Sequence, residues 1–161
     1  SFRLNPRSIC FVPEKRMEVT TEGGLNVKSN AIRIEKLLNL LSNSEIKVAC
    51  FIEPDFNQIE SLKSLGVKTL EFHTGSYADA KTLKIMKQKL FLIQEAAQYA
   101  TQLGFDCHAG HGLNYDNVSN IASIKEIKEL NIGHFIIGEA IFSGLKNSIS
   151  KMKEIINSAR K

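Results

Sequence analysis

Several features that define other protein classes are missing from this 161-residue chain. No apolar run is long enough to span a bilayer, and residues 1–5 lack the apolar stretch of a secretory signal. Basic residues form no block: the net charge of +4 is spread along amphipathic segments, as is typical of solvated helix faces. We therefore expect one cytoplasmic domain over residues 1–161, with neither a membrane nor a nucleic acid among its partners.

Common metal and nucleotide motifs are missing as well. The sequence contains no HExxH and no CxxC, and no GxGxxG follows its first apolar run, so a dinucleotide-binding fold has no direct support. The three cysteines, Cys10, Cys50 and Cys107, each lie within a predicted strand. An odd number of thiols in strands predicts reduced core cysteines in a cytosolic protein.

What the sequence does contain is an alternation of strand-like and helix-like segments. Apolar runs predict strands at residues 9–12, 46–52, 67–72, 105–109 and 132–137, and amphipathic spacing predicts helices at 31–41, 56–65, 79–103, 117–130 and 139–161. Strands that are apolar on both faces and alternate with helices indicate an α/β fold with a parallel sheet. A doubly wound sheet and a (β/α)8 TIM barrel both fit this pattern.

The number of units narrows that choice. The sequence supplies about five strand–helix units, whereas a barrel has eight. We therefore expect either an open five-stranded fold or the C-terminal part of a longer barrel protein.

Polar residues gather where the predicted strands end, which is where parallel α/β folds place their chemistry. Glu53 and Glu71 lie at two of these ends, and all four histidines lie near the last three: His73, His108, His111 and His134. Histidine titrates near neutral pH, so the cluster suits proton transfer. A zinc site built from these histidines with Glu71 is the alternative, although His108 and His111 need not converge on one ion.

Glycines beside these histidines suggest a phosphate site. Gly110 and Gly112 flank His111, and Gly133 precedes His134. Backbone N–H groups of glycine loops and helix N-termini bind phosphate at the last strands of a barrel. The alternative is that these glycines only form tight turns.

The segment from residue 14 to residue 24 has the composition of a loop that closes over a ligand. It combines the cations Lys15 and Arg16, the hydroxyls Thr20 and Thr21, and the paired glycines at 23–24. We expect it to order over an anionic substrate; the alternative is a solvated connector.

Four long motifs, in the same order along the chain, resemble pyridoxine 5′-phosphate synthase. They are VPEKRMEVTTEGGLNV at residues 12–27, EFHTGSYADAKT at 71–82, AGHGLNYDNV at 109–118 and ELNIGHFIIGEAIFSGL at 129–145. The resemblance implies a cytoplasmic (β/α)8 barrel that assembles into a homo-octamer. It also implies an enzyme that condenses 1-deoxy-D-xylulose 5-phosphate with 3-amino-2-oxopropyl phosphate to give pyridoxine 5′-phosphate, phosphate and water, without a metal or an organic cofactor.

The resemblance also assigns roles to individual residues. His111 matches the proton donor of the family, and Glu71 matches the carboxylate that stabilises the transition state. Thr20 matches a contact to the deoxyxylulose phosphate. The positions that hold the phosphate of the amino ketone match Gly112, Gly133 and His134.

The chain departs from the family pattern in two main respects. The first three strand–helix units, which hold a general-base histidine, a general-base glutamate and substrate arginines, have no counterpart here. Glu139 stands where the family is usually basic. Two alternatives therefore stay open: another phosphosugar-binding barrel enzyme, such as an isomerase or aldolase, and a phosphate-binding fragment without catalytic activity.

Overall fold

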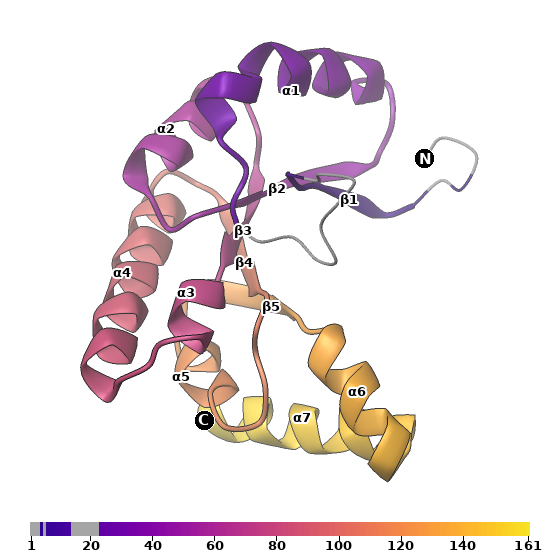
Figure 1. The fold of residues 1–161 in the computed structure, drawn as a ribbon. Coiled ribbons are helices and arrows are strands. Elements are labelled where there is room, and N and C mark those ends of the chain that lie inside the picture. The colour runs from indigo at the N-terminus through magenta and orange to yellow at the C-terminus, as the bar shows by residue number, and fades with distance from the viewer. Residues whose placement is uncertain (1–3, 5, 14–22) are drawn as a thin grey trace.

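The computed structural model describes residue 4, residues 6–13 and residues 23–161, and strands and helices alternate along this part of the chain (Figure 1). The strands are β1 (Ser8–Phe11), β2 (Lys47–Ile52), β3 (Thr69–His73), β4 (Asp106–Gly110) and β5 (Ile127–Asn131). The helices are α1 (Val27–Leu41), α2 (Phe56–Ser64), α3 (Gly75–Ala78), α4 (Leu83–Gln102), α5 (Val118–Ala122), α6 (His134–Ser143) and α7 (Leu145–Ala159). The predicted α/β class is confirmed.

The sheet is wound in one direction. Its strand order is β1-β2-β3-β4-β5, and every neighbouring pair is parallel. A doubly wound sheet would reverse its strand order at a switch point, and the described strands show no such reversal. In Figure 1 the helices form an arc around one side of the curved sheet. This winding places the carboxyl ends of all described strands at one edge.

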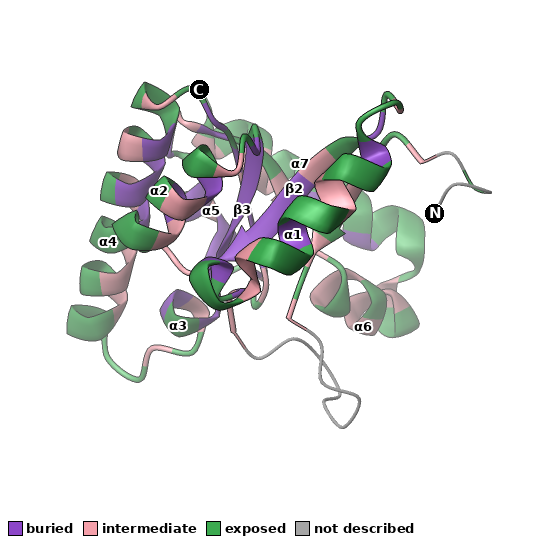
Figure 2. Ribbon diagram, turned by 90° about the horizontal axis from the view of Figure 1, so that it is seen from above, coloured by how far each residue is buried: buried purple, intermediate pink, exposed green. Residues whose placement is uncertain are grey.

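The hydrophobic core lies between the sheet and this arc of helices. Alternate residues of the central strands face the helices, among them Cys50, Ile52, Leu70, Phe72, Cys107 and Ala109. Figure 2 shows buried residues on the sheet and on the inner stripes of the helices, whose outer faces are exposed. Cys50 and Cys107 are buried free thiols, which confirms their predicted place in the core, but Cys10 is exposed. Cys10 lies on β1, at the edge of the described sheet, and faces away from the helices.

The prediction of the fifth strand was wrong. Residues 132–137 are not a strand: β5 precedes them, and α6 begins at His134. The expected helix at 117–130 is accordingly limited to α5. The error has a physical cause: β5 carries Lys128, Glu129 and Asn131, so it has no apolar pattern, whereas the run after it is apolar but helical.

Helix boundaries follow local capping groups that the apolar spacing did not reveal. Asn26 caps α1 through the N–H of Ser29 at 3.1 Å, so α1 begins four residues earlier than predicted. Thr82 caps α4, which separates it from α3. Gly144, with φ 80°, divides the expected final helix into α6 and α7. No helix in the described ranges is both long and apolar enough to cross a membrane.

Gly24 is needed because the chain passes very close to the end of β2. The N–H of Leu25 donates to the carbonyl of Phe51 at 2.7 Å. A Cβ on Gly24 would lie 2.1 Å from the backbone nitrogen of Glu53 and 2.5 Å from the carbonyl carbon of Ile52. Both are backbone atoms, so no side-chain rotation can relieve the overlap.

We expect Gly24→Ala to destabilise the protein by about 1–3 kcal/mol, because the end of β2 must shift to admit a methyl group. Gly23→Ala is the matched control, since a Cβ there meets only Glu53 Oε1 at 3.8 Å. Its unfolding free energy should change by less than about 1 kcal/mol. Urea denaturation of the two variants measures the difference. Equal stabilities would show that the close approach imposes no constraint.

Candidate active site

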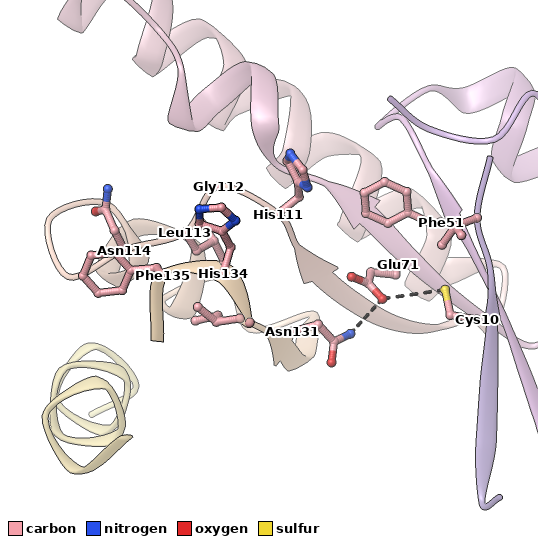
Figure 3. Close-up of a pocket in the computed structure, with 13 residues that line it drawn as sticks. Cys10, Phe51, Glu71, His111, Gly112, Leu113, Asn114, Asn131, His134 and Phe135 are labelled. Atoms are coloured by element: carbon pink, nitrogen blue, oxygen red, sulfur yellow. Dashed lines mark hydrogen bonds between the residues drawn. The ribbon is translucent and has the colours of Figure 1, made fainter. Parts of the chain in front are cut away.

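A pocket of about 550 Å³ opens at the carboxyl ends of the strands (Figure 3). This volume is sufficient for a small phosphorylated ligand. Five of the six predicted site residues line it: Glu71, His111, Gly112, Gly133 and His134. The sixth, Thr20, and most of the expected ligand-covering loop lie outside the described residues. The structure thus brings together residues from three separate strand ends.

Glu71 projects from β3 into the pocket, as predicted. Its Oε2 accepts a hydrogen bond from Asn131 Nδ2 at 2.8 Å and a weaker one from Cys10 Sγ at 3.8 Å (Figure 3). Gly110 leaves the required space, because a Cβ there would lie 2.4 Å from Glu71 Oε1. The described partners of Glu71 are therefore side chains of β5 and β1.

Burial controls the charge of this carboxyl group. Glu71 is only 9% exposed, and burial raises its pKa above the ordinary value, although the Asn131 hydrogen bond acts in the opposite direction. Although Cys10 as a residue is exposed, its thiol lies beside Glu71, where loss of solvent and then the Glu71 charge raise the pKa of Cys10 to about 12, so Cys10 is a neutral thiol. At neutral pH, the free-energy difference between protonated and ionised Glu71 is therefore smaller than it would be in water.

His111 follows β4 in an unusual backbone conformation. Its φ of 81° makes it the one non-glycine residue with positive φ in the described ranges. The hydroxyl of Thr74 lies 2.8 Å from the carbonyl oxygen of Gly110 and 2.5 Å from that of His111. These contacts join the ends of β3 and β4 and hold the imidazole at the pocket.

The loop after His111 depends on Gly112 and on an asparagine pair. Gly112 has φ 75°, and a Cβ there would lie 2.7 Å from the Cβ of Ala78. Its carbonyl accepts from Asn117 Nδ2 at 3.1 Å, while Asn117 Oδ1 accepts from the N–H of Asn114 at 2.8 Å. The N–H of Gly112 is thus carried on a turn with fixed geometry.

Burial is the main influence that lowers the pKa of His111 below 6.5, and the neighbouring His73 and, more weakly, His134 lower it further. The ring centroids of His73 and His111 lie 4.8 Å apart. At neutral pH the free site therefore favours a neutral His111, and an anion bound nearby would favour the protonated form.

Gly133 and His134 lie where β5 meets α6, at the same edge as His111. Gly133 is the N-cap residue of α6, and no side chain in the described part of the chain caps this helix. The free N–H groups of a helix N-terminus attract anions. Correcting the position of β5 therefore moves both residues from a predicted strand to a strand end, where a phosphate site is expected.

His108 does not join the other histidines. It lies deeper on β4, with its ring 3.5 Å from Asp106 and 3.7 Å from Glu129. Among the described residues, no three His, Cys, Asp or Glu side chains converge as metal ligands would. His73, His111 and His134 lie at strand ends, as predicted, but they do not form a ligand set.

Comparison with known sequences gives this pocket its context. The profile of the family described as pyridoxal phosphate biosynthesis protein PdxJ matches residues 1–158. The chain belongs to the PdxJ family. The match covers all five described residues of the pocket that were predicted as site residues.

Three relatives named pyridoxine 5′-phosphate synthase illustrate the relationship. The protein from Rhodospirillum rubrum is 44% identical over 159 residues, 99% of this chain and 64% of its own length. The protein from Sulfurihydrogenibium sp. is 48% identical over 97% of this chain and 64% of its own length. The protein from Zymomonas mobilis is 46% identical over 96% of this chain and 60% of its own length. This PdxJ chain thus spans 60–64% of the length of these curated relatives.

Among solved structures, a CutC-type copper homeostasis protein from Streptococcus agalactiae overlaps with a TM-score of 0.47 and 16% identity, over 68% of this chain and 50% of that one. A likeness this remote carries no argument about function.

Sequence reasoning missed two partners in this PdxJ site. Asn131 directly precedes the strand predicted at residues 132–137 and so was not expected at a strand end, beside Glu71. Glu53, noted only as a residue at a strand end, lies 2.7 Å from His73. The apolar pattern contains no signal for such contacts, because they depend on which strands are neighbours.

Proposed function

We propose that this chain carries the ring-closing site of a pyridoxine 5′-phosphate synthase. The reaction joins 3-amino-2-oxopropyl phosphate to 1-deoxy-D-xylulose 5-phosphate and yields pyridoxine 5′-phosphate, phosphate and water. The observation that carries this proposal is the pocket itself: in a PdxJ chain, Glu71, His111 and a set of glycine and helix N–H groups line one small cavity.

We also propose that residues 1–161 are a single domain, the C-terminal five units of a (β/α)8 barrel. The unbroken parallel order β1-β2-β3-β4-β5 supports this proposal, as does the greater length of the curated relatives. Three further units would then join β1 to β5 and supply the remaining catalytic groups.

The chemistry requires several proton transfers, and the pocket offers groups for them. Condensation of the amine with the carbonyl, loss of phosphate, addition of water and dehydration each move a proton. In the proposal, His111 donates a proton to a leaving oxygen. Glu71, as a carboxylate, stabilises the positive charge that develops as the imine forms. Partial burial of the site strengthens both interactions.

Substrate phosphate is proposed to bind opposite these groups, on the N–H groups of Gly112, Gly133 and His134. Its negative charge would raise the pKa of His111, so substrate binding would itself favour the protonated state that a donor needs. Thr20 is the proposed contact for the second phosphate.

Self-association into an octamer and a cytoplasmic location complete the proposal. Apolar side chains on α6 supply surface that such contacts could cover: Ile137, Ile141 and Phe142 are 60%, 78% and 89% exposed.

An activity assay tests the function directly. The full-length protein, mixed with both substrates, should form pyridoxine 5′-phosphate, and the 161-residue chain alone should not. Failure of the full-length protein would favour the phosphate-binding alternative. An aldolase would need a Schiff-base lysine, and no lysine is among the described residues that line the pocket.

Inorganic phosphate tests the anion site separately. We expect crystals of the full-length protein soaked in phosphate to show the anion within hydrogen-bond distance of the N–H groups of Gly112, Gly133 and His134. His134→Ala keeps all three N–H groups, so its Kd for phosphate should rise by less than about tenfold, the value of one hydrogen bond. An empty corner, with phosphate bound elsewhere, would contradict the assignment.

A further inference from the structure

A carboxylate–imidazole pair lies directly behind His111. Glu53 follows β2 and His73 ends β3, so parallel pairing places the two residues side by side. Glu53 Oε1 lies 2.7 Å from His73 Nδ1 and also accepts the N–H of Gly24 at 2.9 Å. Neither Glu53 nor His73 is among the described residues that line the pocket. Any influence of the pair on a bound ligand must therefore pass through another residue.

The hydrogen bonds define the protonation state of the pair. The hydrogen bond with His73 is the main influence that lowers the pKa of Glu53. Glu53 is therefore a carboxylate, which can accept hydrogen bonds but cannot donate them. His73 Nδ1 must then carry the proton. His73 Nε2 is buried with no partner among the described residues, and the side chain is only 8% exposed.

His73 packs directly against His111. The ring centroids lie 4.8 Å apart, and Phe51 packs edge-on against His73 at 5.1 Å. A Cβ on Gly75 would lie 2.5 Å from His73 Nε2 and 3.1 Å from His111 Cδ2, so the β3–α3 turn closes tightly over both rings. This packing limits the directions in which the ring of His111 can point.

We propose that Glu53 and His73 are positioning residues for His111: His73 fixes the orientation of its imidazole, and Glu53 holds His73 and supplies a negative charge that favours protonated His111. This inference rests on the proposed role of His111 as proton donor. The titratable groups around His111 are His73 on β3, His134 on α6, Asp79 after α3 and Glu53 after β2. Of these, the acids favour the protonated ring and the histidines oppose it.

Glu53→Gln removes the charge of the pair but keeps an oxygen that can accept from His73 and Gly24. In the full-length protein we expect the pKa of His111 to fall by about half a unit or more. At pH 7.5 kcat should fall about tenfold, while KM should change little because Glu53 does not line the pocket. NMR titration of ¹³Cε1-labelled histidine, assigned with a His111→Asn spectrum, measures the pKa without any turnover.

His73→Asn tests the other half of the pair and predicts the opposite sign. Loss of the ring admits water to His111 and removes a neighbouring imidazole, so the pKa of His111 should rise toward its ordinary value. The rate should still fall about tenfold, because the ring of His111 is no longer held. Glu35→Gln, an exposed change on α1, is the control and should alter neither quantity.

Opposite shifts in the two variants would establish the positioning role. An unchanged His111 pKa in a folded Glu53→Gln or His73→Asn variant would overturn it, and so would unfolding of both, which would make the pair purely structural. If the wild-type protein forms no product, the proposed function fails, but the titrations still decide whether the pair controls His111.

Discussion

The His111→Asn variant of the full-length protein should lose about 10²–10⁴-fold in kcat while KM stays nearly unchanged. The reason is that asparagine cannot donate a proton of suitable pKa, whereas phosphate binding depends on backbone N–H groups that the substitution leaves in place. Steady-state kinetics with both substrates measures the split between kcat and KM.

Asparagine is also the substitution best suited to this backbone position. His111 has φ 81°, and asparagine tolerates positive φ better than other residues with a Cβ. The variant should therefore be as stable as the wild-type protein. His108→Asn is the matched control, because His108 lies outside the pocket lining, and its activity should be nearly unchanged. An unchanged kcat in His111→Asn would show that His111 is not the donor, and an unfolded variant would make it a structural histidine.

The pH dependence offers a second test of the same residue. Burial and His73 lower the pKa of His111 below 6.5, so kcat/KM of the wild-type protein should decrease as pH rises through a value below 6.5. The corresponding decrease in kcat should lie at higher pH, because bound phosphate stabilises the protonated ring. Both decreases should be absent from His111→Asn. If they persist in the variant, another group supplies the proton.

The sequence alone was sufficient to predict the strands that have an apolar face toward the core. The ends of β1 to β4 were predicted to within two residues. These strands carry apolar side chains that pack against the helices, such as Cys50 and Ile52 on β2. It was not sufficient for β5, in which Lys128, Glu129 and Asn131 interrupt the apolar pattern and Asn131 lines the pocket. A strand that contributes polar groups to a site loses the apolar pattern that would reveal it, so the prediction failed next to the pocket.

The site was predictable to the same extent, and for the same reason. Parallel strands bring their carboxyl ends together whatever lies between them, so the rule that chemistry lies at strand ends located Glu71 and His111. The rule does not specify which side chains touch. Asn131 reaches Glu71 across the intervening strand β4, and Glu53 reaches His73 from the neighbouring strand. These contacts depend on register and rotamer, which sequence alone does not supply.

Glu71→Gln should have the second large effect on catalysis, a loss of about 10²–10³-fold in kcat, because the substitution removes the charge aimed at the reacting atoms. The amide has nearly the same shape, and its oxygen can still accept from Asn131 Nδ2. Glu129→Gln on β5 is the control, since Glu129 lies outside the pocket lining and its side chain is 61% exposed. Equal activities of the two variants would remove Glu71 from the mechanism.

The same substitution should make the protein more stable. Burial raises the pKa of Glu71 in the folded state above its ordinary value of 4.5, so folding favours the protonated form. Its contribution to stability is complete below the unfolded pKa and is lost as pH rises through the folded pKa. Wild type should therefore be less stable than Glu71→Gln at pH 8, and the difference should shrink as pH approaches 4. Denaturant titrations at these two pH values measure it. If the wild-type protein is as stable as the variant at pH 8, the partners of Glu71 fully compensate for its burial. If Glu71→Gln is more stable but less active, the carboxylate is retained for catalysis although it destabilises the fold.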